Sequence, residues 1–332
     1  MDILLNWLWQ GCAVTAAVSV ALTLCRGLSA TTRYQVWWAT LVLVLILPAL
    51  PSLVAAVLPA RETVTGLAPL RSVMLPPLSR WPLTTLVIVW AVWMAVMFWR
   101  TVRAFSRVRF LKQACVPFPA VRQTRLAHWM SIHTIGRRVR LVVSDQVRCA
   151  AAIGLYSPVI AVAPAVLREL DDEELDRILV HEWAHIQRRD DIARLFQLFV
   201  NVLVGFNPAV WWIDRRIEIE REVACDDQVI EITGGRTAYA KSLLKLAAVP
   251  NRPVDLSLVS AVLSAPKLSA RILRLLDSRR NVSTRRSLVA LTLAAPGLLV
   301  LALSVASMTP VTLAVEELRP LPATERVSLV PP

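Results

Sequence analysis

Four long apolar stretches without a single charged side chain limit what this chain can fold into. They cover approximately residues 3–25, 34–58, 82–99 and 288–308. Crossing a hydrocarbon core takes about 20 helical residues, so each stretch is long enough to span a bilayer. Hydrophobic residues make up 56% of the chain and charged residues 18%, against about 45–50% and about 25% in soluble domains. The pattern predicts a polytopic membrane protein with four transmembrane helices, and it excludes a soluble globule, a disordered chain and a coiled coil.

The basic residues beside these stretches predict the orientation of the chain, because Lys and Arg concentrate in cytoplasmic loops. The linker 26–33 and the two ends of the loop 100–287 carry ten arginines, whereas the opposite side carries five. Both termini should therefore lie outside, with the tail 309–332 extracytoplasmic and the loop 100–287 in the cytosol. The first stretch lacks a basic start and is longer than the apolar core of a cleavable signal peptide, so we expect it to be retained.

The net charge of +13 has two interpretations, a nucleic-acid surface or basic loops that orient a membrane protein. The loop 100–287 contains 30 Lys/Arg and 19 Asp/Glu, which accounts for most of this charge. Its basic residues do not alternate with aromatic residues as in a single-strand binding channel, so we expect no direct nucleic-acid binding. The five cysteines include no C-x-x-C pair, which argues against a disulfide framework.

One motif in the loop carries recognisable chemistry. The residues from His181 to His185 read H-E-W-A-H, and two histidines four apart share one face of a helix, where they can chelate a single ion. Glu182 lies about 100° further round the helix, near enough to take a proton from a water on that ion. Asp171 and Glu174 form a capping pattern at the start of this helix. Since the chain has only four histidines, this spacing favours a zinc site over two surface histidines beside a solvated acid.

A catalytic zinc site needs a third protein ligand and leaves one position to water. Glu222 and Asp226 lie four residues apart, so both side chains point the same way from one helix. We take Glu222 as the third ligand and Asp226 as the group that orients a ligating histidine through its other ring nitrogen. Cys225 points away from this face and is interpreted as a core residue, while His128 and His133 are interpreted as surface or core histidines.

The apolar segment 192–213 between these ligands predicts a helical hairpin and not a fifth crossing. If His185 and Glu222 hold one ion, the chain between them must return to the side from which it left. The turn comes at residues 205–208, Gly-Phe-Asn-Pro, in which the asparagine is an N-cap and the proline a first helical residue. The arm before the turn is about 14 residues or about 21 Å long, shorter than a hydrocarbon core of about 30 Å. We expect a hairpin near 191–232 that either dips into the bilayer or packs as a buried core.

Further segments accompany the H-E-W-A-H motif along the chain. In order, with the motif standing after the first, they are Gly154–Ile160 (GLYSPVI), Arg188–Asp190 (RRD), Phe206–Trp212 (FNPAVWW), Glu222–Asp226 (EVACD) and Tyr239–Leu244 (YAKSLL). This ordered set resembles the M56 peptidases, the membrane metalloproteases of the BlaR/MecR antibiotic-sensor type. The resemblance extends over nearly the whole chain, and four spans with a large loop between the third and the fourth also fit it.

The resemblance implies a gluzincin-type protease that binds one zinc ion through His181, His185 and Glu222, with Glu182 as general base. In sensor members, cytosolic proteolysis inactivates a BlaI/MecI-like repressor, and self-cleavage accompanies activation. Those members also carry an extracellular penicillin-binding domain with an S-x-x-K nucleophile. Here the roughly 24 residues after Met308 contain neither S-x-x-K nor K-T-G. We therefore expect this chain to lack that sensor domain and not to sense β-lactams directly.

Some features keep two interpretations each. Tyr239 either stabilises the oxyanion of the tetrahedral intermediate or packs in the core. Asp190 and Asp191 either brace the zinc helix or are solvated acids. Val159–Val162 either offers an edge strand to an extended substrate or is an ordinary strand of a sheet. The segment 250–266 is either a self-cleaved loop or a linker.

The expected fold is mainly α, with a membrane domain at 1–99, a cytosolic gluzincin-like (α+β) zinc protease domain at 100–287 and a fourth span at 288–308. Short strands are expected at Val139–Ser144 and Pro158–Val162. The expected function is a zinc endopeptidase of the bacterial cytoplasmic (inner) membrane that cleaves a cytosolic or membrane-associated protein, such as a repressor, in signal transduction. Two alternatives are an M48-like quality-control protease and a non-proteolytic signalling scaffold that contains zinc. Self-cleavage and a homodimer are left open.

Overall fold

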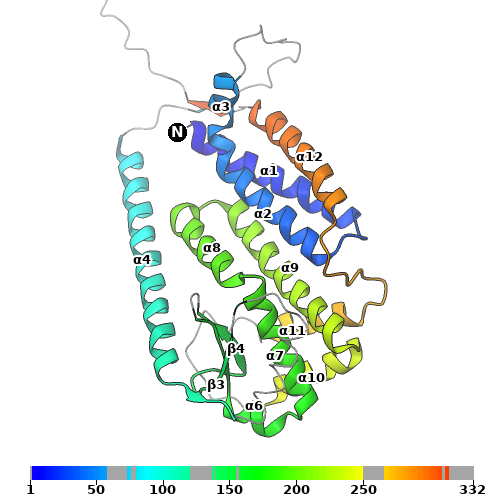
Figure 1. Ribbon diagram of the computed structural model, residues 1–332. Coiled ribbons are helices and arrows are strands. Elements are labelled where there is room, and N and C mark those ends of the chain that lie inside the picture. Colours follow the sequence, from blue (N-terminus) through cyan, green and yellow to red (C-terminus); the bar gives the residue numbers. More distant parts are fainter. Residues whose placement is uncertain are drawn as a thin grey trace, which may run out of the picture.

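The computed structural model is mainly helical (Figure 1), and it describes residues 2–57, 73–75, 80–119, 137, 139–154, 157–249, 265–308 and 311–313. The prediction of a mainly α protein is confirmed. The helices are α1 (Asp2–Leu24), α2 (Ala30–Ile46), α3 (Leu50–Val57), α4 (Arg80–Gln113), α6 (Pro164–Glu169), α7 (Asp172–Gln187), α8 (Asp190–Val204), α9 (Pro208–Thr233), α10 (Arg236–Ala248), α11 (Ala265–Leu276) and α12 (Leu288–Ala306). The strands are β1 (Val73–Leu75), β2 (Val116–Pro117), β3 (Arg140–Val143), β4 (Ala150–Ile153), β5 (Val159–Val162) and β6 (Val311–Leu313). His128, His133 and most of the segment 250–266 and of the tail 309–332 lie outside the described residues.

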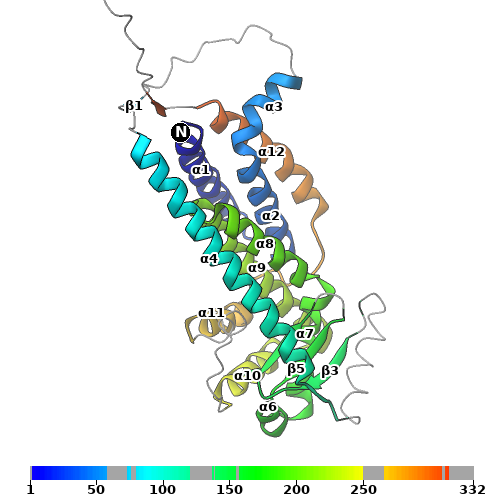
Figure 2. The same cartoon turned by 90° about the vertical axis from the view of Figure 1, so that its left-hand side faces the viewer.

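Within the described residues, four helical segments are long and apolar enough to cross a membrane: α1, α2 with its continuation to Leu53, α4 and α12. Helices α1, α2 and α12 gather at one end of the molecule, while α4 runs along its side toward the other end (Figures 1 and 2). The second segment passes through a 3-10 turn, Leu47–Ala49, before α3 begins. Pro48 in this turn has no backbone N–H to donate, which explains why the regular α-helix stops there.

The helices at this end pack closely because small residues let them approach. A Cβ atom on Gly11 of α1 would lie 3.2 Å from the Cβ of Ala209 and 3.3 Å from the Cγ1 of Val44. The indole of Trp7 donates a hydrogen bond of 2.7 Å to the carbonyl of Val44. Gln10 donates to the carbonyl of Val305 at the end of α12. These contacts tie α1, α2, α9 and α12 into one apolar cluster.

A small sheet lies at the opposite end, with the strand order β2-β3-β5-β4. Strands β3 and β5 are parallel, and β4 runs antiparallel to β5. The strands expected at Val139–Ser144 and Pro158–Val162 are present as β3 and β5. The suggestion that Val159–Val162 offers an edge strand is wrong, because β5 has neighbours on both sides. In the described sheet the edge strands are β2 and β4 (Ala150–Ile153), and β4 packs against α7.

Helices α7, α8 and α9 connect this sheet to the cluster of long apolar helices. A reciprocal capping box between Asp171 and Glu174 starts α7. Helix α8 leads away from the end of α7, and the chain reverses where Asn207 caps the first turn of α9 through its side-chain oxygen. Apolar residues on one side of the first half of α9, including Ile213 and Ile217, belong to the cluster formed by α1 and α2. Its second half returns to pack against α7.

The close approach at Gly11 gives a prediction about stability. Gly11→Val should lower the free energy of unfolding by about 1–3 kcal/mol, because the added methyl groups overpack the contact with Ala209 and Val44. Thermal unfolding in detergent measures the change. Gly27→Val is the matched control, since a Cβ there meets no atom of the described residues within 4 Å. Equal unfolding temperatures for the two variants would contradict the packing.

Candidate metal centre

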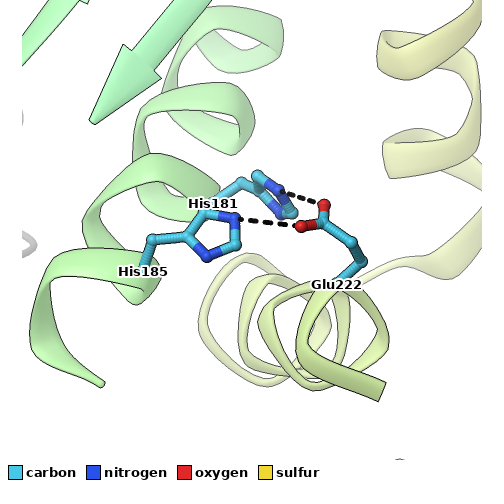
Figure 3. Close-up of side chains that lie close together, drawn as sticks. All are labelled: His181, His185 and Glu222. Atoms are coloured by element: carbon cyan, nitrogen blue, oxygen red, sulfur yellow. Dashed lines mark ion pairs between the residues drawn. The ribbon is translucent and has the colours of Figure 1, made fainter. Parts of the chain in front are cut away.

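Helices α7 and α9 bring His181, His185 and Glu222 together (Figure 3). The Nε2 atom of His181 lies 3.7 Å from Oε2 of Glu222, and the Nε2 atom of His185 lies 3.8 Å from Oε1. The three ligand atoms all lie within 4.8 Å of one another. Tetrahedral zinc with nitrogen and oxygen ligands at about 2.1 Å separates those atoms by about 3.4 Å. The triad therefore fits a zinc ion with only small shifts of its side chains.

The carboxylate of Glu222 has the properties of a metal ligand. Its Oε2 is buried and has no hydrogen-bond partner among the described residues. Burial alone would raise its pKa, but His185, His181 and Arg271 hold the pKa of Glu222 well below its usual range. Glu222 therefore presents a charged carboxylate to both imidazole rings, as a metal ligand must.

The second ring nitrogen of each histidine faces an acidic side chain. His181 Nδ1 lies 3.2 Å from Oδ1 of Asp226, and His185 Nδ1 lies 2.8 Å from Oδ2 of Asp190. Such partners hold the rings so that Nε2 faces the metal. The structure places Asp226 beside the Nδ1 atom of His181. Asp190 is buried beside His185, which favours the bracing interpretation for this residue. It is the first residue of α8, directly after the end of the helix that carries both histidines.

Glu182 lies between the two histidines on α7 and contacts the edge of the sheet. Its Oε2 accepts a hydrogen bond of 2.8 Å from the backbone N–H of Ala152 on β4. The contact fixes the carboxylate beside the edge strand, one residue from a metal ligand. An extended peptide added to the free edge of β4 would therefore lie next to Glu182.

Two residues complete the surroundings of Asp226. Tyr239 is fully buried and donates its hydroxyl to Oδ1 of Asp226 at 2.8 Å, which favours the packing interpretation of this tyrosine. Arg271 of α11 donates to both carboxylate oxygens, at 3.1 Å from Nε and 2.6 Å from Nη2. Burial would raise the pKa of Asp226, but Arg271 keeps it well below the usual range. Sequence analysis missed Arg271, because no motif spacing links it to the histidines.

Cys225 lies behind the metal ligands. Its Sγ is 3.3 Å from Nδ1 of His185 and 3.7 Å from Oδ2 of Asp190. The side chain is fully buried, and burial raises the pKa of the thiol well above its usual value. A neutral thiol facing Nδ1, and not Nε2, agrees with a core residue.

Comparisons with known proteins point to the same chemistry. A family model described as BlaR1 peptidase M56 matches residues 4–275. The regulatory protein BlaR1 of Bacillus licheniformis is 25% identical over 133 residues, which are 40% of this chain and 22% of that protein. A methicillin resistance mecR1 protein of Staphylococcus aureus is 18% identical over 172 residues, which are 51% of this chain and 29% of that protein. The matched part thus spans less than a third of the length of these relatives. Because the family model extends over most of the sequence, the chain belongs to the M56 peptidase family.

Proposed function

We propose that this protein is a zinc-dependent endopeptidase of the bacterial cytoplasmic membrane. The observation that carries the proposal is the convergence of His181, His185 and the charged Glu222 carboxylate, with Glu182 next to His181 on the same helix. A purely structural zinc site closes its fourth position with another protein ligand and has no use for a neighbouring base. Three ligands with an adjacent carboxylate are typical of hydrolysis.

The three side chains would hold one Zn²⁺. When bound there, the ion would polarise the scissile carbonyl and lower the pKa of a water to about 7. Asp226 and Asp190 keep the two imidazoles oriented for this task. Membership of the M56 family supports the same assignment.

Glu182 carries the proton transfers of peptide hydrolysis. Its carboxylate takes one proton from water while the water oxygen bonds to the carbonyl carbon. It then delivers that proton to the amide nitrogen as the C–N bond breaks, so that a carboxylate and an amine leave. The Ala152 N–H bonds one carboxylate oxygen of Glu182 and leaves the other for this exchange.

The candidate membrane spans suggest where the enzyme acts, and the matched relatives suggest its kind of substrate. If the loop 100–287 lies in the cytosol, as its flanking arginines favour, the site at the base of the hairpin of α8 and α9 would lie near the cytosolic face of the bilayer. The matched relatives are named as regulatory and resistance proteins. We therefore assign a regulatory substrate, such as a BlaI/MecI-like repressor, in preference to misfolded membrane proteins. A substrate segment would bind in extended form along β4 (Ala150–Ile153).

Replacing the base tests the enzyme assignment. Glu182→Gln should retain zinc and lose peptide cleavage by about 10²–10⁴-fold, because an amide cannot accept the proton. Metal analysis and cleavage of a fluorogenic peptide library by the purified full-length protein measure both. Glu173→Gln on the same helix is the control, since its carboxylate is exposed and pairs with Arg177. Cleavage by Glu182→Gln at the wild-type rate would refute the role of this residue.

Removing the third ligand tests the site. Glu222→Ala should reduce bound zinc well below one ion per chain, since two histidines alone hold zinc weakly. Glu231→Ala, on the same helix and exposed, should leave the zinc content unchanged. Full zinc stoichiometry in Glu222→Ala would move the third ligand to another residue.

Zinc binding at pH 7 should release about one proton. Burial and Arg271 oppose protonation of His181, but Asp226 and Glu222 outweigh them and raise its pKa to about 9. The ring is therefore charged at pH 7 before zinc binds and neutral afterwards, so affinity should increase as the pH rises from 7 toward 9. Calorimetry in buffers of different ionisation enthalpy counts the protons. A count near zero would contradict this coupling.

A further inference from the structure

Arg271 of α11 is a buried guanidinium at the edge of the ligand triad. It is 7% exposed. Its Nη2 lies 3.4 Å from Nε2 of His181, and its Nη1 lies 3.8 Å from Oε2 of Glu222. These two neighbours are the atoms assigned to the metal. Arg271 therefore reaches the side of the triad on which the metal binds, in addition to contacting Asp226 behind it.

A permanent positive charge at this position weakens metal binding by repulsion, so metal affinity does not explain it. Orientation of Asp226 does not fully explain it either, because Tyr239 already donates a hydrogen bond to the same carboxylate. A group that only braced Asp226 would not need to reach Nε2 of His181. The placement suits a task in which negative charge develops beside the metal.

The three guanidinium nitrogens of Arg271 differ in their hydrogen bonds. Nε and Nη2 face Asp226, and Nη2 also contacts the hydroxyl of Tyr239 at 3.2 Å. Nη1 makes no hydrogen bond to any residue that the structure describes. The hydroxyl of Tyr239, the other group considered for the oxyanion, is committed to Asp226. Nη1 is thus a side-chain donor without a hydrogen bond to the described residues at the triad, and the bidentate pair with Asp226 holds it in place.

Resting on the proposed peptidase function, we propose that Arg271 is a catalytic residue whose Nη1 donates a hydrogen bond to the carbonyl oxygen of the scissile peptide bond. When the water oxygen bonds to the carbonyl carbon, the π pair of the carbonyl moves onto its oxygen. The guanidinium stabilises that negative charge and keeps its own proton, because an arginine side chain is not deprotonated in proteins. When the C–N bond breaks, the pair re-forms the carbonyl, and Glu182 supplies the proton to the amine.

Kinetics of three variants test the proposal. A library screen with wild-type protein first identifies a cleaved peptide, and kcat and KM for that peptide are then measured with zinc-loaded, full-length protein. Arg271→Gln should lower kcat by about 10²–10³-fold, the effect of losing one oxyanion donor, with KM and zinc content close to wild type. Arg271→Lys keeps the charge opposite Asp226 and should fold, but one ammonium cannot bind Asp226 and substrate in the bidentate geometry, so kcat should fall here too. Arg274→Gln, one turn along α11, is the matched control and should be unchanged.

Inhibitor binding gives a readout that does not depend on turnover. A phosphinic pseudopeptide of the cleaved sequence has a tetrahedral, charged group with oxygen atoms for Arg271, whereas a mercaptoacyl peptide offers only a thiolate. Arg271→Gln and Arg271→Lys should weaken the phosphinic inhibitor by about 10²-fold and leave the mercaptoacyl inhibitor unchanged.

The outcomes separate this proposal from the one on which it rests. Wild-type kcat in both Arg271 variants would overturn it. Equal weakening of the two inhibitors would overturn it as well, and would assign Arg271 to positioning His181 through Asp226. If the wild-type protein cleaves no peptide, the proposed function fails and this proposal fails with it. Loss of phosphinate binding together with intact zinc content supports the oxyanion role.

Discussion

The meeting of His181, His185 and Glu222 governs how the rest of the chain can be arranged. Their ligand atoms lie within 4.8 Å of one another, although the chain between His185 and Glu222 builds α8 and the first half of α9. Helices α8 and α9 therefore run out and back as a hairpin. The apolar half of that hairpin then needs partners, and α1, α2 and α12 provide them. The meeting of the three side chains and the packing of the hairpin against α1, α2 and α12 therefore depend on each other.

Buried charge around the triad is balanced in pairs. Arg271 faces Asp226, Arg188 lies 3.6 Å from Asp190, and Arg221 lies 3.8 Å from Glu222. Taking such groups out of water is costly, and each isolated charge would destabilise the fold. Pairing lets the carboxylates remain ionised where they orient imidazoles. Oε2 of Glu222 makes no hydrogen bond to any residue that the structure describes, so its position is set by the charges around it.

Local signals predicted much of this molecule. The four apolar stretches, the capping box at Asp171 and the spacing of His181 and His185 are each set within a few turns of chain. Glu222 could be inferred because a helix presents positions i and i+4 on one face. Strand β4 and Arg271 were not foreseen. The alanine-rich strand carries little β-propensity, and the position of Arg271 depends on how α11 docks, which is a long-range packing result.

Helix α9 has 26 residues without a break, from Pro208 to Thr233. Along this helix, Glu222 lies about 14 Å from Ile213. Ile213 packs in the apolar cluster of α1, α2 and α12, whereas Glu222 belongs to the triad. The first half of α9 packs against α1, α2 and α12 and its second half carries Glu222, so the seating of one unbroken helix among these apolar neighbours also sets where the carboxylate stands.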